Sequence, residues 1–127
     1  MRSYIVLSTL VLLTLGFQAF GSPQPEDASI IRLIANPKEY DGKIVRLIGY
    51  VNLEFEGNAI YLHKEDCKRG IDANGLWLNV DEQVRKNRKR YHHKYILIEG
   101  TFDAKDKGHL NGWPGAVGKI TRWYIWQ

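Results

Sequence analysis

The stretch of residues 44–55 constrains the fold most, because apolar and polar side chains alternate along it. A period of two is typical of a β-strand with one buried face. Gly49 interrupts the pattern, and a glycine inside a strand marks a sharp bend or a close approach of another segment. We therefore predict one long, bent strand that pairs with two neighbours. The expected inward side chains are Val45, Leu47, Val51, Leu53 and Phe55, and the outward ones are Arg46, Tyr50, Asn52 and Glu54.

Four later segments carry weaker strand signals, and one segment between them has a helical charge pattern. Residues 81–91 begin with acids and end with bases, which complements a helix dipole. Upstream, Ser29 can cap a short helix that ends at Asn36 and Pro37. The order strand, strand, strand, helix, strand, strand predicts an all-β domain with one or two short helices, a five-stranded OB-fold-like barrel. The four later strands are expected at residues 59–63, 76–80, 95–102 and 116–126.

The first strand carries a family resemblance. Residues 40–51, with the sequence YDGKIVRLIGYV, resemble the opening strand of bacterial OB-fold domains of the tRNA-anticodon-binding-like kind. Residues 99–102 (EGTF) and the glycine-rich loop before the last strand are similar to those of small exported bacterial OB-fold proteins. The resemblance covers residues 38–127 and implies the fold. It transfers no catalytic residue, because the shared positions are turn glycines and core aliphatic residues.

Residues 1–21 have the pattern of a cleaved signal peptide. Arg2 precedes an uncharged apolar run at residues 5–17, and the small residues Ala19 and Gly21 suit cleavage after Gly21. The alternative is an uncleaved anchor, but the run is shorter than the ~20 apolar residues that span a bilayer. We expect a periplasmic or secreted protein with no transmembrane anchor in its mature chain. Residues 22–37 form a polar lead and the short helix, and residues 38–127 form the barrel domain.

The single cysteine, Cys67, excludes an internal disulfide. It lies far from the end of the signal segment, so we expect no lipid anchor there, and the fold must depend on apolar packing. Flanking bases such as Lys68 and Arg69 favour a lowered thiol pKa and a reactive cysteine. The alternative interpretation is an incidental loop thiol.

OB-folds bind ligands across their second and third strands and the adjoining loops. Aromatic rings beside positive charge suit single-stranded nucleic acid, and the same surface suits sugar rings. Alternatively, the aromatics are ordinary cross-strand pairs, and Glu54 and Glu56 would repel phosphate. The candidate ligand-binding residues are Arg46, Tyr50, Tyr61, His63, Trp77 and Asn79.

The formal net charge of the chain is +4, and six basic residues lie close together between residues 85 and 94. Such a cluster can bind phosphates or an anionic surface, or it can be a solvated helix face. We call the following residues the basic cluster: Arg85, Lys86, Arg88, Lys89, Arg90 and Lys94.

The four histidines, His63, His92, His93 and His109, show no metal-ligand spacing. Adjacent His92 and His93 point to different sides of any regular element and can share a metal only in a loop conformation. We therefore expect no metal site and no cofactor.

The sequence favours an exported, non-catalytic binding module for an anionic or oligomeric ligand or a protein partner. One alternative is a structural or interaction protein of the cell envelope, which would use exposed strand edges or the aromatic end near Trp123 and Trp126. A second is a secreted metal-dependent nuclease. Its residue types are present without a recognisable constellation, in Asp66, Asp72, Asp103, Asp106, Arg69 and Arg122.

Overall fold

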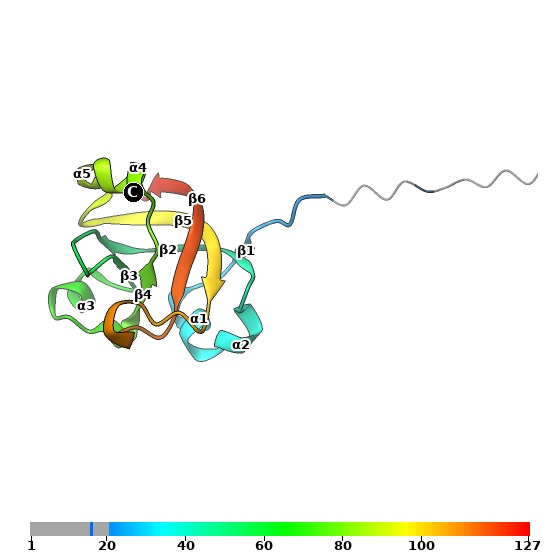
Figure 1. Ribbon diagram of the computed structural model, residues 1–127, viewed down its shortest axis with the longest axis horizontal. Helices are drawn as coiled ribbons and strands as arrows, with labels where there is room; N and C mark the ends of the chain where they lie inside the picture. Colours follow the sequence, from blue (N-terminus) through cyan, green and yellow to red (C-terminus); the bar gives the residue numbers. More distant parts are fainter. Residues whose placement is uncertain (1–15, 17–20) are drawn as a thin grey trace, which may run out of the picture.

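The computed structural model of the chain describes residues 16 and 21–127. The predicted signal peptide, residues 1–21, lies outside the described residues except for Gly16 and Gly21. Figure 1 shows a small barrel with short helices at its two ends, and residues 21–25 extend from it on one side. Among the described residues, no helix has the length and apolar character needed to cross a membrane.

Five strands close the barrel in the order β2-β3-β4-β6-β5, with β5 returning to β2. The parallel pairing of β4 with β6 closes the barrel, and its other pairings are antiparallel. This confirms the predicted five-stranded all-β barrel, and its five strands follow one another along the chain as predicted. The strands are β2 (Ile44–Asn52), β3 (Ala59–Tyr61), β4 (Gly75–Leu78), β5 (Lys94–Asp103) and β6 (Ala116–Ile125).

Strand β2 is long and pairs with two neighbours, as its sequence predicts. It pairs with β5 from Ile44 to Val51 and with β3 from Tyr50 to Asn52. Gly49 is buried at the crossing, where a Cβ atom would lie 2.6 Å from the carbonyl oxygen of Tyr61. Glycine is needed there because the backbone of β3 approaches too closely for any side chain.

A two-residue strand, β1 (Glu26–Asp27), was not predicted. It pairs in parallel with Val45 and Arg46 of β2. Lys43 Nζ lies 3.4 Å from Glu26 Oε2, and Arg46 Nη1 lies 3.2 Å from Asp27 Oδ1. The segment before the barrel is therefore held against its first strand.

Apolar side chains fill the barrel, and a helix contributes to the core from one end. Helix α1 (Ile30–Ala35) begins as predicted, with Ser29 Oγ accepting a hydrogen bond from the Arg32 N–H at 3.2 Å. Its Ile30 and Leu33 are buried in the same core. The core side chains from the strands include Val45, Leu47, Val51, Ile60, Leu76, Leu78, Ile96, Ile98, Phe102 and Val117.

The helices differ from the prediction at three places. Two segments predicted as loops contain short helices, and one predicted helix is divided into two. Pro37 ends α1 but also begins α2 (Pro37–Tyr40), since proline suits the first position of a helix. The polar stretch near Cys67 forms α3 (Lys64–Lys68) and a 3-10 turn, η1 (Asp72–Asn74). The predicted helix at 81–91 is divided at Asn87 into α4 (Glu82–Lys86) and α5 (Arg88–Tyr91).

The first three strands end earlier than predicted. Because β2 stops at Asn52, residues 53–58 form a loop, and the alternation no longer sets the direction of Phe55. Its side chain is 91% exposed, so the prediction that it faces the core is wrong.

Candidate ligand groove

A groove of about 560 Å³ opens on the side of the barrel. Its walls come from the β2–β3 loop (residues 53–58), β4, the two helices α4 and α5, and the β5–β6 loop (residues 104–115). Loops between the first two and the last two barrel strands flank the usual ligand site of OB-folds. The floor is apolar, with Leu53, Val80 and Val84.

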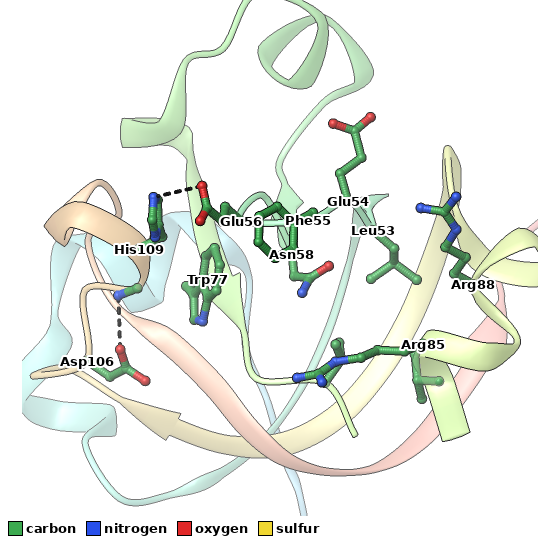
Figure 2. A pocket seen from close by; sticks show the side chains of 13 residues that line it. Leu53, Glu54, Phe55, Glu56, Asn58, Trp77, Arg85, Arg88, Asp106 and His109 are labelled. Carbon is green, nitrogen blue, oxygen red and sulfur yellow. Dashed lines mark hydrogen bonds and ion pairs between the residues drawn. The ribbon is translucent and has the colours of Figure 1, made fainter. Parts of the chain in front are cut away.

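Two aromatic rings lie in this groove between a histidine and a pair of arginines (Figure 2). Figure 2 shows Phe55 and Trp77 near the middle, His109 to one side, and Arg85 and Arg88 to the other. Phe55 is almost fully exposed, whereas Trp77 is half-buried. The groove therefore offers flat apolar surfaces with cationic groups at one end.

The acidic groups of the groove already have partners. Glu56 Oε2 lies 3.4 Å from His109 Nε2, and Glu54 Oε1 lies 3.9 Å from His92 Nε2. Asp106 accepts hydrogen bonds from the backbone N–H of Gly108 and from the Asn79 side chain. These contacts fix the positions of the three carboxylates at the edge of the groove.

A chain of hydrogen bonds holds Trp77 against the β5–β6 loop. Trp77 Nε1 donates to Asn79 Oδ1 at 2.9 Å, and Asn79 Nδ2 donates to Asp106 Oδ2 at 2.7 Å. Gly108 has φ +67° and lies directly on the indole, where a Cβ atom would meet ring carbons at 2.6 Å. The position of the ring is thus set by neighbours on two elements.

The groove edge also concentrates left-handed backbone. Among the described residues, five non-glycine residues have positive φ. Glu56 is one of them and belongs to the Glu56–His109 pair, and Leu110 and Asn111 are two more, which follow His109 in the chain. Such conformations are costly and gather where the surrounding structure enforces them, often at functional sites.

The structure brings only two of the predicted ligand-binding residues to the groove. Trp77 lines it, and Asn79 braces that ring. Arg46 instead pairs with Glu99 at 2.7 Å on the outer surface of the barrel, where Arg122 reaches the same carboxylate at 2.9 Å. His63 is exposed next to α3 and does not line the groove.

Tyr50 and Tyr61 point out of the barrel but do not form an exposed stacking surface, which corrects that prediction. Their exposed fractions are 6% and 4%. Tyr61 packs with Ala59 and Trp113 in a second apolar cluster, and Tyr50 stacks edge-on against Tyr95 at 5.3 Å. Both rings are covered by segments that follow them in the chain.

Tyr61 should give the domain an alkaline transition. Its hydroxyl donates to Asp72 Oδ1 at 2.7 Å, and burial together with this carboxylate raises the pKa of Tyr61 above its ordinary value. The unfolded chain releases this proton above about pH 10, whereas the folded chain retains it, so stability falls as pH rises further. Urea unfolding of wild type and Tyr61→Phe at increasing pH tests this. The wild type should lose more stability than the variant above about pH 10, and parallel pH profiles would contradict the prediction.

The sequence analysis did not predict that Phe55, Glu56, Arg85 and His109 line one groove. The available signal was the expected position of the two loops in an OB-fold. Residues of the basic cluster divide between surfaces, since Arg85 and Arg88 line the groove while Arg90 lines a separate depression beside Trp123. Arg85 Nη1 lies 3.7 Å from Glu82 Oε2. Among the described residues, no carboxylate forms an ion pair with Arg88.

Glu54, His92 and His93 have potential ligand atoms within 4.8 Å of one another. His93 adopts φ +58°, which supplies the loop conformation that stacks the two imidazoles with centroids 3.6 Å apart. However, His92 Nδ1 accepts a hydrogen bond from the Leu53 N–H, which leaves the proton of a neutral ring on Nε2. A metal at Nε2 would have to displace that proton and break the Leu53 contact, so the arrangement is poorly suited to a metal.

Cys67 lies half-buried in α3. Burial, followed by the charges of Glu54 and Asp72, raises its pKa above the ordinary value. This shift is opposite in direction to the one that the reactive-thiol hypothesis requires, and it favours the interpretation of Cys67 as an incidental thiol.

The carboxylates considered for a nuclease serve in local structure. Asp66 is buried and accepts from Asn74, and Asp103 accepts from backbone N–H groups of its own loop. Asp72 and Asp106 are engaged as described above.

Comparison with known proteins adds no relative. No family model matches the chain, and no curated protein matches it in sequence.

Proposed function

We propose that this chain is a non-catalytic OB-type binding module whose groove takes an anionic oligomer with rings that stack on aromatic side chains. Single-stranded nucleic acid and acidic oligosaccharide share this chemistry. The observation that carries the proposal is the placement of Phe55 and Trp77 beside Arg85 and Arg88 over an apolar floor. Stacking on such rings contributes about 1–3 kcal/mol per base, while the guanidinium groups attract the backbone charges.

The proposal also covers the localisation of the protein and the family to which it is related. The pattern of residues 1–21 supports export to the periplasm or beyond. The sequence of the first barrel strand supports a relation to exported OB-fold proteins of the anticodon-binding-like kind, and the barrel order supports the fold that they share.

An interaction role in the cell envelope is the second candidate, because one outer surface carries exposed apolar side chains. The register places Ile48 opposite Leu97, and Leu97 opposite Tyr124. Tyr124 is 54% exposed, and Trp126 near the same end is 47% exposed. This surface lies on β2, β5 and β6, whereas the groove is built from the loops, β4 and the helices.

Binding measurements at increasing salt test the groove proposal. The probes are an oligothymidylate and a uronic-acid oligosaccharide, titrated into the chain between about 50 and 200 mM salt. We expect binding of at least one probe that weakens steeply with salt. Arg85→Gln/Arg88→Gln should weaken it roughly 10²- to 10⁴-fold, because the variant loses two charged contacts that contribute about 1.5–3 kcal/mol each.

The control for this experiment removes the same charge from the same two helices. Lys86→Gln/Lys89→Gln alters two residues of the basic cluster that do not line the groove. We expect less than a fivefold loss, as for distant surface charges. Equal losses in both double variants, or no binding of either probe, would refute the proposed site.

A further inference from the structure

A histidine outside the groove holds one of the groove walls. His92 Nδ1 accepts a hydrogen bond of 2.9 Å from the backbone N–H of Leu53. Leu53 is 3% exposed and is the first residue of the β2–β3 loop, which carries Phe55 and Glu56 into the groove. This side chain therefore fixes the point where the loop leaves the barrel.

The backbone around His92 is itself anchored to the end of β2. The N–H of His93 donates to the carbonyl oxygen of Val51 at 2.8 Å, and the two imidazoles stack. The His92 ring cannot follow the loop without breaking these contacts. The strength of the Leu53 contact therefore depends on the ring remaining an acceptor.

Protonation removes that acceptor. An imidazolium carries hydrogens on both nitrogens and can only donate, so its Nδ1–H would face the Leu53 N–H. The buried amide would then lack a partner, which destabilises this conformation of the loop. No other ionisable side chain makes a hydrogen bond to Leu53 among the described residues.

Burial of the His92 ring and the charges around it set the pH at which the ring is protonated. Burial has the largest effect and lowers the pKa of His92, and the neighbouring His93 and Arg88 act in the same direction. Glu54 acts in the opposite direction, with its carboxylate 3.9 Å from Nε2. Across the adjacent depression, Lys64 and Lys68 of α3 face Glu54 and His93. The neutral ring is therefore the resting form near neutral pH, and acidification charges it.

We propose that His92 is a proton-sensitive clasp, which holds the β2–β3 loop at neutral pH and releases it in mildly acidic solution, weakening ligand binding in the groove. The effect on binding rests on the proposed function of the groove. The release of the loop does not, since it concerns a contact within the chain itself.

Amide exchange of the full chain tests the clasp without any ligand. Protection of the Leu53 amide, corrected for intrinsic exchange, should fall roughly tenfold as His92 protonates, because one hydrogen bond is lost. His92→Asn places a non-titrating carbonyl oxygen near the position of Nδ1. This variant should remain folded and lose the acid-induced step at Leu53.

Matched variants separate the clasp from other titrations. His93→Asn changes the neighbouring ring, and His109→Asn removes the other histidine that contacts a groove carboxylate. Both variants should retain the Leu53 step. If Leu53 protection stays constant while the His92 ring titrates, or if His92→Asn leaves the step unchanged, the proposal is overturned.

The binding arm of the experiment uses the oligothymidylate and the uronic-acid oligosaccharide. For whichever probe binds, wild-type affinity should fall about tenfold over the same pH interval, and His92→Asn should remove that part of the fall. If neither probe binds while the Leu53 step is present, the groove function fails and the clasp stands. If a probe binds with an unchanged affinity across the Leu53 step, the coupling of clasp to groove is wrong.

Discussion

Replacing Phe102 with alanine is expected to lower the free energy of unfolding by about 3–5 kcal/mol, the usual range for a fully buried phenylalanine. Phe102 is 1% exposed and lies in the barrel core near the end of β5. Its ring is in close contact with the backbone at Gly115, where a Cβ atom would lie 2.9 Å from the ring. Phe102 packs within the main cluster of buried side chains and against the backbone at Gly115, so removal of its ring should leave a cavity. Urea unfolding followed by tryptophan fluorescence measures the loss.

Phe55→Ala provides a control with identical chemistry. Phe55 is 91% exposed, and surface substitutions usually change stability by less than about 0.5 kcal/mol. The same variant should weaken ligand binding in the groove, because Phe55 lines it. Similar destabilisation by the two substitutions would show that the described core is wrong.

The second large effect is expected from Gly49→Ala. The added methyl group would lie 2.6 Å from a backbone carbonyl oxygen of β3 and 2.6 Å from Ile60 Cγ1. Because the backbone cannot move without opening the β2–β3 pairing, we expect a loss of about 1–3 kcal/mol, as for an overpacked core. Thermal unfolding monitored by circular dichroism is a suitable measurement.

Gly118→Ala tests whether the effect at Gly49 is steric. Gly118 is also a strand glycine, but a Cβ atom there would have its nearest neighbours at 3.5 Å, an ordinary contact. Alanine should be tolerated or slightly stabilising, since glycine in a strand is destabilising by about 0.5–1 kcal/mol. A loss at Gly118 as large as that at Gly49 would argue against the close approach of β3.

The sequence was informative about the barrel because its signals are local. Alternation in residues 44–51 reports which side of a strand is apolar, and Gly49 reports a place where a side chain does not fit. Ser29 likewise satisfies the first turn of α1 through a contact three residues away. The alternation and the helix cap depend only on nearby residues, and a glycine inside a strand marks a close approach without showing which segment makes it.

The site was harder to predict because periodicity gives the direction of a side chain but not what covers it. Tyr61 does point away from the barrel interior, yet Trp113, which is distant in the sequence, packs over it. Phe55 has the parity of a core residue, but the strand ends three residues earlier. The pairing of Glu56 with His109 joins two loops, and no local pattern encodes that encounter.

The short pairing of β1 with β2 limits how far the barrel can lie from whatever precedes it. Residues 22–25 are the only link between the predicted cleavage position at Gly21 and Glu26, the first paired residue. Four extended residues reach about 14 Å. If the leader were retained in a membrane, residues 22–25 would be a short tether that keeps the barrel at the bilayer surface and restricts its rotation. Cleavage of the leader would release the barrel to diffuse.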